Sequence, residues 1–168
     1  MEIVRIIRID PGLRQTGWGI IESDGVRLKY LACGTVRTDT SIDLSARLMN
    51  VYKGLAIPLA DWKPDEAAVE QTFVNKNGAS TLKLGQARGV AMLVPAMSNL
   101  PVAEYSATKV KKTVIGTGRG DKKQIGVMVS FLLPKARPDS EDAADALAIA
   151  ITHAHHRKAN ALKMRVTA

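Results

Sequence analysis

The sequence has little cysteine, few aromatic residues and no long apolar run. Its single cysteine, Cys33, excludes a disulfide framework or a cysteine metal cluster within one chain, and we expect it to be a small buried side chain. No segment approaches the roughly 20 apolar residues that a membrane-spanning helix needs. The N-terminal segment MEIVRIIRID mixes charge into its apolar run, unlike a signal peptide. We therefore expect a cytoplasmic protein.

Acidic residues are also in short supply. The 16 Asp and Glu are outnumbered by 24 Lys and Arg, which gives a formal net charge of +8. Residues 109–123 contain six of these cations and one acid, Asp121, and the segment after His156 contains no acid. Such a balance indicates a polyanionic partner, most often nucleic acid. Because only 4% of the residues are aromatic, the composition argues against a single-strand stacking platform.

The hydrophobic pattern predicts a single α/β domain. With 168 residues and 46% hydrophobic content, the chain can bury one real core. Three strands joined by short turns come first and form an antiparallel meander, and helices and strands then alternate, which favours a mixed sheet. We expect one domain over residues 1–157 and a basic, flexible tail over 158–168. The predicted strands span 3–10, 16–22, 27–38, 66–72 and 100–106, and the predicted helices span 79–97, 106–114, 121–133 and 139–156, with another beginning near Asp43.

Four carboxylates occupy unusual places in this pattern. Asp10 ends an Ile-rich strand, Glu70 comes late in another, and Asp142 and Asp145 share one face of the last helix. Each has an ordinary explanation, namely a turn cap, an edge residue or first-turn helix acids. Together, buried carboxylates at one sheet edge would need cations. In a basic protein this favours Mg²⁺, and two such ions about 4 Å apart could clamp the attacking water and the leaving oxygen of a phosphodiester.

Four segments carry a family resemblance. "IDPGLRQTGWGII", "AVEQTF", "LKLGQARGV" and "DAADALAIAITHAHH" resemble the RuvC family of Holliday junction resolvases in order and spacing, from about residue 3 to 157. The resemblance implies a ribonuclease H-like fold with a five-stranded sheet. It also implies Mg²⁺-dependent nicking of two like strands of a four-way DNA junction, with two Mg²⁺ per site and Mn²⁺ as a substitute. A homodimer acting beside RuvA and RuvB in recombination and repair is implied as well.

The resemblance also implies roles for individual residues. Asp10, Glu70, Asp142 and Asp145 match the metal ligands, Lys111 and Lys122 match lysines near the scissile phosphate, and Phe73 matches an aromatic that disturbs base stacking. For the lysines, an ordinary solvated surface position remains an alternative, and for Phe73, a lid on the core. The predicted DNA-binding residues are Phe73, Lys76, Lys83, Arg88, Lys111, Lys112, Arg119, Lys122 and Lys123.

One residue departs from the family pattern. The position two before the first Asp is usually Gly or another small residue, and here it is Arg8, on the same strand face as Asp10. It could pair with a site carboxylate or crowd the metal. Arg8 therefore favours one alternative function, a non-catalytic junction-binding module. A second alternative is an ATPase of the actin and sugar-kinase type, whose phosphate loop resembles Asp10, Gly12, Thr16 and Gly17. The length of the chain counts against it, because that fold needs two such domains. For the dimer interface we expect the helix over 78–97.

Overall fold

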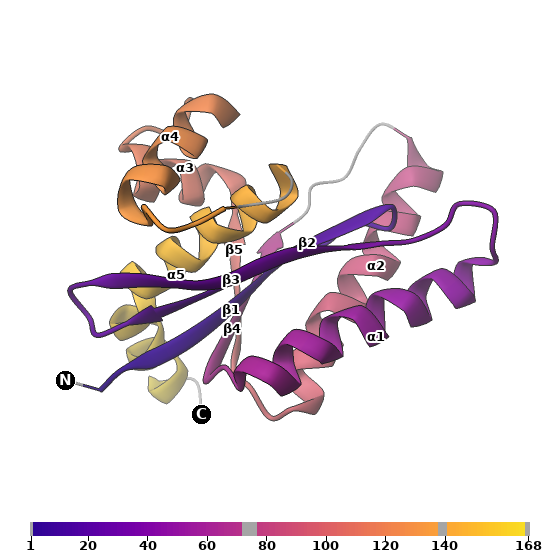
Figure 1. Ribbon diagram of the computed structural model, residues 1–168, viewed down its shortest axis with the longest axis horizontal. Helices are drawn as coiled ribbons and strands as arrows, with labels where there is room; N and C mark the ends of the chain where they lie inside the picture. Colours follow the sequence, from indigo (N-terminus) through magenta and orange to yellow (C-terminus); the bar gives the residue numbers. More distant parts are fainter. Residues whose placement is uncertain (1, 72–76, 138–140, 167–168) are drawn as a thin grey trace.

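The strands of the computed structural model form one mixed sheet. The structure describes residues 2–71, 77–137 and 141–166. The side chains of residues 141, 142 and 144 and of those beyond 157 lie outside this description. In chain order the elements are β1 (Val4–Asp10), β2 (Gln15–Ser23), β3 (Leu28–Arg37), α1 (Leu44–Trp62), β4 (Glu66–Gln71), α2 (Gly78–Met97), β5 (Val102–Ser106), α3 (Ala107–Ile115), α4 (Lys122–Leu132) and α5 (Glu141–Val166). The sheet order is β3-β2-β1-β4-β5 (Figure 1). β1, β2 and β3 are antiparallel neighbours, whereas β4 is parallel to β1 and β5. The predicted mixed sheet is therefore confirmed.

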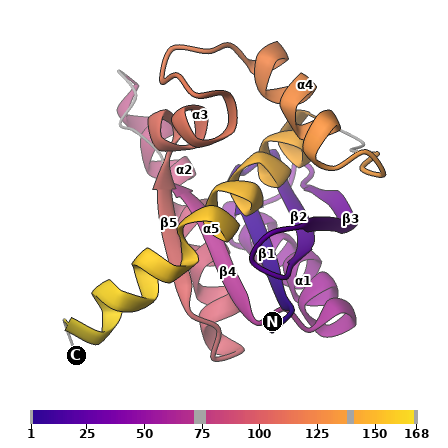
Figure 2. The same ribbon diagram turned by 90° about the vertical axis from the view of Figure 1, so that its left-hand side faces the viewer.

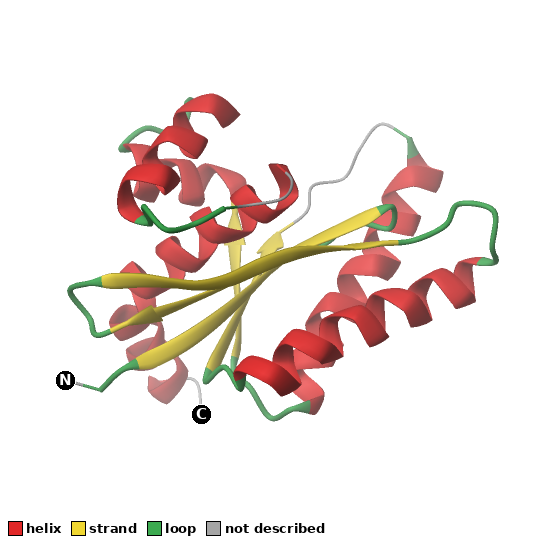
Figure 3. Cartoon of the chain, viewed as in Figure 1, coloured by secondary structure: helices red, strands yellow, loops and turns green. Residues whose placement is uncertain are grey.

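Alternation along the central strands divides the core in two. On β1, Ile7 and Ile9 pack with Val51 and Leu55 of α1 on one face, and Ile6 packs on the other face, in the core that α3, α4 and α5 complete. Figure 3 shows the sheet as a single layer between these two sets of helices, and Figure 2 shows α5 running across its face. The strands are therefore buried on both faces, which explains the near-continuous apolar run of β1.

The helix starts agree with the capping residues in the sequence. Asp121 caps α4: its side chain accepts a hydrogen bond from the Gln124 amide at 2.8 Å, and the Gln124 side chain accepts one from the Asp121 amide. Ser106 caps α3 through the Lys109 amide. α1 begins after Asp43, whose side chain makes no capping hydrogen bond. The caps of α3 and α4 matter here because both helices border the carboxylates described below.

The last helix is longer than expected. α5 continues to Val166, so residues 158–166 extend the helix rather than begin a separate segment at the expected boundary. The division into a domain and a flexible tail stays a prediction, because the side chains of that stretch lie outside the described residues. Within the described residues, no helix is both long enough and apolar enough to cross a membrane.

Candidate active site

Two parallel strands bring the first two carboxylates together. β1 and β4 are hydrogen-bonded neighbours with Ile9 opposite Val69, so Asp10 and Glu70 follow next in register at the same edge of the sheet. The turn after Asp10 requires glycine, because a Cβ on Gly12 would lie 2.2 Å from the Gln15 carbonyl oxygen. The strand pattern thus places both acids on the face of the sheet that α5 covers.

The third and fourth carboxylates arrive with the start of α5. The helix packs close to the sheet at Gly19, where a Cβ would meet the Leu147 side chain at 2.9 Å. Its first turns therefore lie over the ends of β1 and β4. Asp145 faces this edge, and its Oδ2 atom forms an ion pair with Lys122 Nζ at 3.3 Å. Asp142 lies one turn earlier on the same helix, and its side chain is outside the described residues.

Arg8 lies at the centre of the carboxylates. Its side chain is fully buried, and its Nη2 atom is 3.2 Å from Glu70 Oε2. Its Nη1 atom donates to the main-chain oxygen of Asp145. Burial lowers the pKa of the Arg8 guanidinium, and the charges of Asp10, Glu70 and Asp145 oppose that change. Of the two outcomes that the sequence left open for Arg8, pairing with a site carboxylate is therefore observed.

Burial changes the pKa of two of the site carboxyl groups. Burial raises the pKa of Asp10 to about 8; Arg8 opposes this rise and the adjacent Glu70 carboxylate adds to it. Burial also raises the pKa of Asp145, against the effect of Lys122. Among the described residues no three His, Cys, Asp or Glu side chains already form a metal-binding group. The donor set nonetheless fits a hard divalent cation, because crowded carboxylate oxygens with raised pKa values are stabilised by such an ion.

Two lysines complete the pocket beside these acids. A cavity of about 180 Å³ is lined by Lys111 of α3 and Lys122 of α4, together with Glu70 and Asp145. Apolar residues of α3, α4 and α5 form the remaining wall. Six residues are predicted to be catalytic, and the structure brings five of them together: Asp10, Glu70, Lys111, Lys122 and Asp145. The side chain of the sixth, Asp142, lies outside the described residues.

The other predicted DNA-binding residues are more scattered. Lys112, Arg119 and Lys123 are exposed on α3, α4 and the loop between them. Phe73 and Lys76 lie outside the described residues. These positions stay predictions for contacts with nucleic acid.

Two predicted residues of α2 have different surroundings. Arg88 pairs with Glu104 and donates to the Glu70 main-chain oxygen, so it already supports the end of β4. Lys83 lines a separate groove of about 700 Å³. Sequence reasoning missed Arg14 in this groove, although its place in the loop directly after Asp10 was a usable signal. The groove offers a second set of cations near the site.

Comparison with known proteins decides the family. The family model "Crossover junction endodeoxyribonuclease RuvC" matches residues 6–153. The chain belongs to the RuvC family. The RuvC of Bradyrhizobium diazoefficiens is 64% identical over 163 residues, which cover 97% of this chain and 93% of that protein. A RuvC of Rhodopseudomonas palustris (strain TIE-1) is 65% identical over 156 residues, covering 93% and 90%.

A solved RuvC structure supports the same assignment. Thermus thermophilus RuvC in complex with a Holliday junction substrate matches with a TM-score of 0.87 and 27% identity, covering 94% of this chain and 96% of that one. The fold is therefore the ribonuclease H-like fold that the resemblance implied. RuvC nucleases are metal-dependent enzymes that hydrolyse phosphodiester bonds. Neither the actin-like ATPase nor the non-catalytic module is favoured by these relatives.

Proposed function

We propose that this protein resolves Holliday junctions by metal-dependent, paired nicking of two like strands during DNA recombination and repair. The observation that carries the proposal is the meeting of Asp10, Glu70 and Asp145 beside Lys111 and Lys122, in a chain of the RuvC family. The basic composition suits the substrate, because cations that contact phosphates fix position on DNA without reading its sequence.

The carboxylates define where the metal would bind. Asp10, Glu70, Asp142 and Asp145 would hold Mg²⁺, with two ions per site. When bound, the metal supplies Lewis acidity and a water of lowered pKa for attack on the phosphodiester. The protein's own part is to fix these oxygens on three rigid elements, β1, β4 and α5. Arg8 and Lys122 keep Glu70 and Asp145 in place through their ion pairs.

The lysines would act on the phosphate. Lys122 lies beside Asp145 and is 66% exposed, so its ammonium group can also reach a phosphate at the mouth of the pocket. Lys111 lines the same pocket from α3. A point charge placed there stabilises the negative charge that grows on the transferring phosphate. We assign no side chain as a general base, because a metal-bound hydroxide can serve.

The assembly follows from the substrate. A symmetric junction needs two cuts and one chain offers one site, so we propose an isologous homodimer. The helix α2 is the proposed interface, since it carries the exposed apolar side chains Leu82, Leu93 and Met97. We further propose that the dimer works in the cytoplasm beside RuvA and RuvB.

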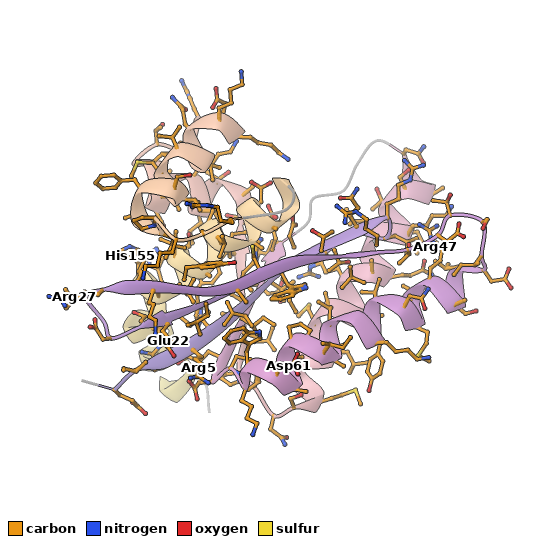
Figure 4. The ribbon with its side chains drawn as sticks, viewed as in Figure 1. Arg5, Glu22, Arg27, Arg47, Asp61 and His155 are labelled. Carbon is orange, nitrogen blue, oxygen red and sulfur yellow. The ribbon has the colours of Figure 1, made fainter. Side chains whose placement is uncertain are left out.

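The proposal can be tested with a synthetic four-way junction that has labelled arms. The protein and its D10N, E70Q and D145N variants are compared with and without Mg²⁺, with plain duplex of the same sequence beside them. D61N is the matched control, because Asp61 is an exposed carboxylate of α1, on the opposite face of the sheet (Figure 4). We expect paired symmetric nicks for wild type and D61N, and binding without nicking for the other three. Cutting retained with Asp10 and Glu70 both neutralised would refute the proposal, and wild-type binding without nicking would indicate a non-catalytic module.

A further inference from the structure

Arg8 occupies a place that the neighbouring strands leave open. In register it lies between Gly19 of β2 and Ala68 of β4, two residues with almost no side chain. The long side chain can therefore extend along the α5 face toward the end of the sheet. It is completely buried there, which is rare for arginine unless its charge is paired.

The contacts of Arg8 join the elements that hold the site. Its terminal nitrogens reach the Glu70 carboxylate on β4 and the Asp145 main-chain oxygen on α5. Its Nε atom is buried and has no hydrogen-bond partner among the described residues. Among the described side chains, the charges of the site acids Asp10, Glu70 and Asp145 offset the cost of its burial. Arg8 is thus held in this position by the Glu70 carboxylate, a proposed metal ligand, and by the main chain of Asp145.

We infer that Arg8 is a resident cation of the carboxylate site, which positions Glu70 and competes with the divalent ion for it. This inference rests on the proposed metal site. One Glu70 oxygen is already engaged by the guanidinium, so a metal ion that uses this oxygen must displace Arg8 or share it. A fixed positive charge among the ligands also repels a second cation. The result is a site of weakened metal affinity in which Glu70 is ordered before metal binds.

The test measures metal binding directly, without DNA. Mn²⁺ is titrated into the full-length protein by calorimetry, with free Mn²⁺ followed by electron paramagnetic resonance. R8G restores the small residue usual at this position in the family, and R8M keeps a long side chain without the charge. R8K retains the charge. R5M is the matched control, because Arg5 lies on the same strand and pairs with Glu22 away from the site, as labelled in Figure 4. Thermal unfolding checks that each variant is folded.

We expect R8G and R8M to bind Mn²⁺ at least tenfold more tightly than wild type, while R8K and R5M stay within threefold. The Mn²⁺ concentration for half-maximal junction nicking should fall in the same order. Unchanged affinity in both R8G and R8M would overturn the role of Arg8 and leave the metal site standing. If R5M or R8K gained as much Mn²⁺ affinity as R8G and R8M, the buried charge of Arg8 could not be the cause of the weakened metal binding. No Mn²⁺ binding by any variant would overturn the metal site itself, and this inference with it.

Discussion

Replacement of Glu66 by Gln should destabilise the protein in a pH-dependent way. Glu66 begins β4, and its carboxylate is 2.6 Å from His153 Nε2 and within 2.6–2.8 Å of two Arg157 nitrogens. Burial by itself raises the pKa of Glu66, but His153 and Arg157 outweigh it and lower the pKa from 4.5 to about 2. The carboxylate is therefore much more stable in the folded chain than in the unfolded one.

The magnitude follows from this shift. A lowering of the Glu66 pKa from 4.5 to about 2 corresponds to a stabilisation of the folded chain by roughly 3.4 kcal/mol. Solvent screens the partly exposed carboxylate and reduces this stabilisation to about 2–3 kcal/mol. Because the folded pKa is depressed, the contribution is fully present above pH 4.5, the unfolded value, and is lost as the pH falls toward 2. E66Q should thus lower the free energy of unfolding by about 2–3 kcal/mol at pH 7, and the deficit should shrink by about half near pH 3.

Urea unfolding followed by circular dichroism at pH 7, 5, 4 and 3 measures both quantities. E22Q is the control, because Glu22 pairs with Arg5 and Lys29, whose side chains are 43% and 71% exposed. Pairs of this exposed kind contribute about 0–1 kcal/mol. The reasoning is refuted if E66Q costs no more than E22Q at pH 7, or if its deficit is the same at pH 3.

Three further predictions concern the elements around the site. G19A should push α5 away from the sheet through Leu147, costing about 1–3 kcal/mol in thermal unfolding and reducing junction nicking more than junction binding; an unchanged melting temperature would contradict this. K122M should reduce nicking by about 10–100-fold with junction affinity little changed, whereas K53M, which changes an exposed lysine of α1 on the opposite face of the sheet, should cut at the wild-type rate; a loss in K122M no greater than that in K53M would contradict the role of Lys122. D121A should remove the capping box of α4 and cost about 1–2 kcal/mol in urea unfolding, and a loss below the error of that measurement would count against the cap.

Much of the site could be predicted because local patterns decide it. Apolar runs ending in Asp10 and Glu70 mark strand ends, and parallel pairing then brings such ends to one edge. The i, i+3 spacing of Asp142 and Asp145 places them on one helix face. These features depend on neighbouring residues and on rules of sheet topology, so a single sequence carries them.

The remaining features depend on how distant elements pack. Strand alternation puts Arg8 on the face of Asp10, but its pairing with Glu70 and the Asp145 carbonyl requires the position of α5 along the sheet. His153 shows the same limit. It hydrogen-bonds the Tyr105 hydroxyl of β5 and the carboxylate of Glu66 at the start of β4, contacts that depend on how α5 crosses the sheet. Tertiary packing sets both outcomes.

The contacts between β4 and α5 fix the position of the helix along the strand. The strand carries a glutamate near each end, and the helix runs over it so that one glutamate meets His153 and the other lies beside Asp145. Asp145 and His153 are eight positions apart on the helix, which corresponds to about 12 Å along its axis. The ion pairs of Glu66 with His153 and Arg157 therefore tie α5 to the start of β4, at the end of the strand opposite the site. The same strand and helix thus carry both the acid-sensitive Glu66 pairs and two of the proposed metal ligands, Glu70 and Asp145.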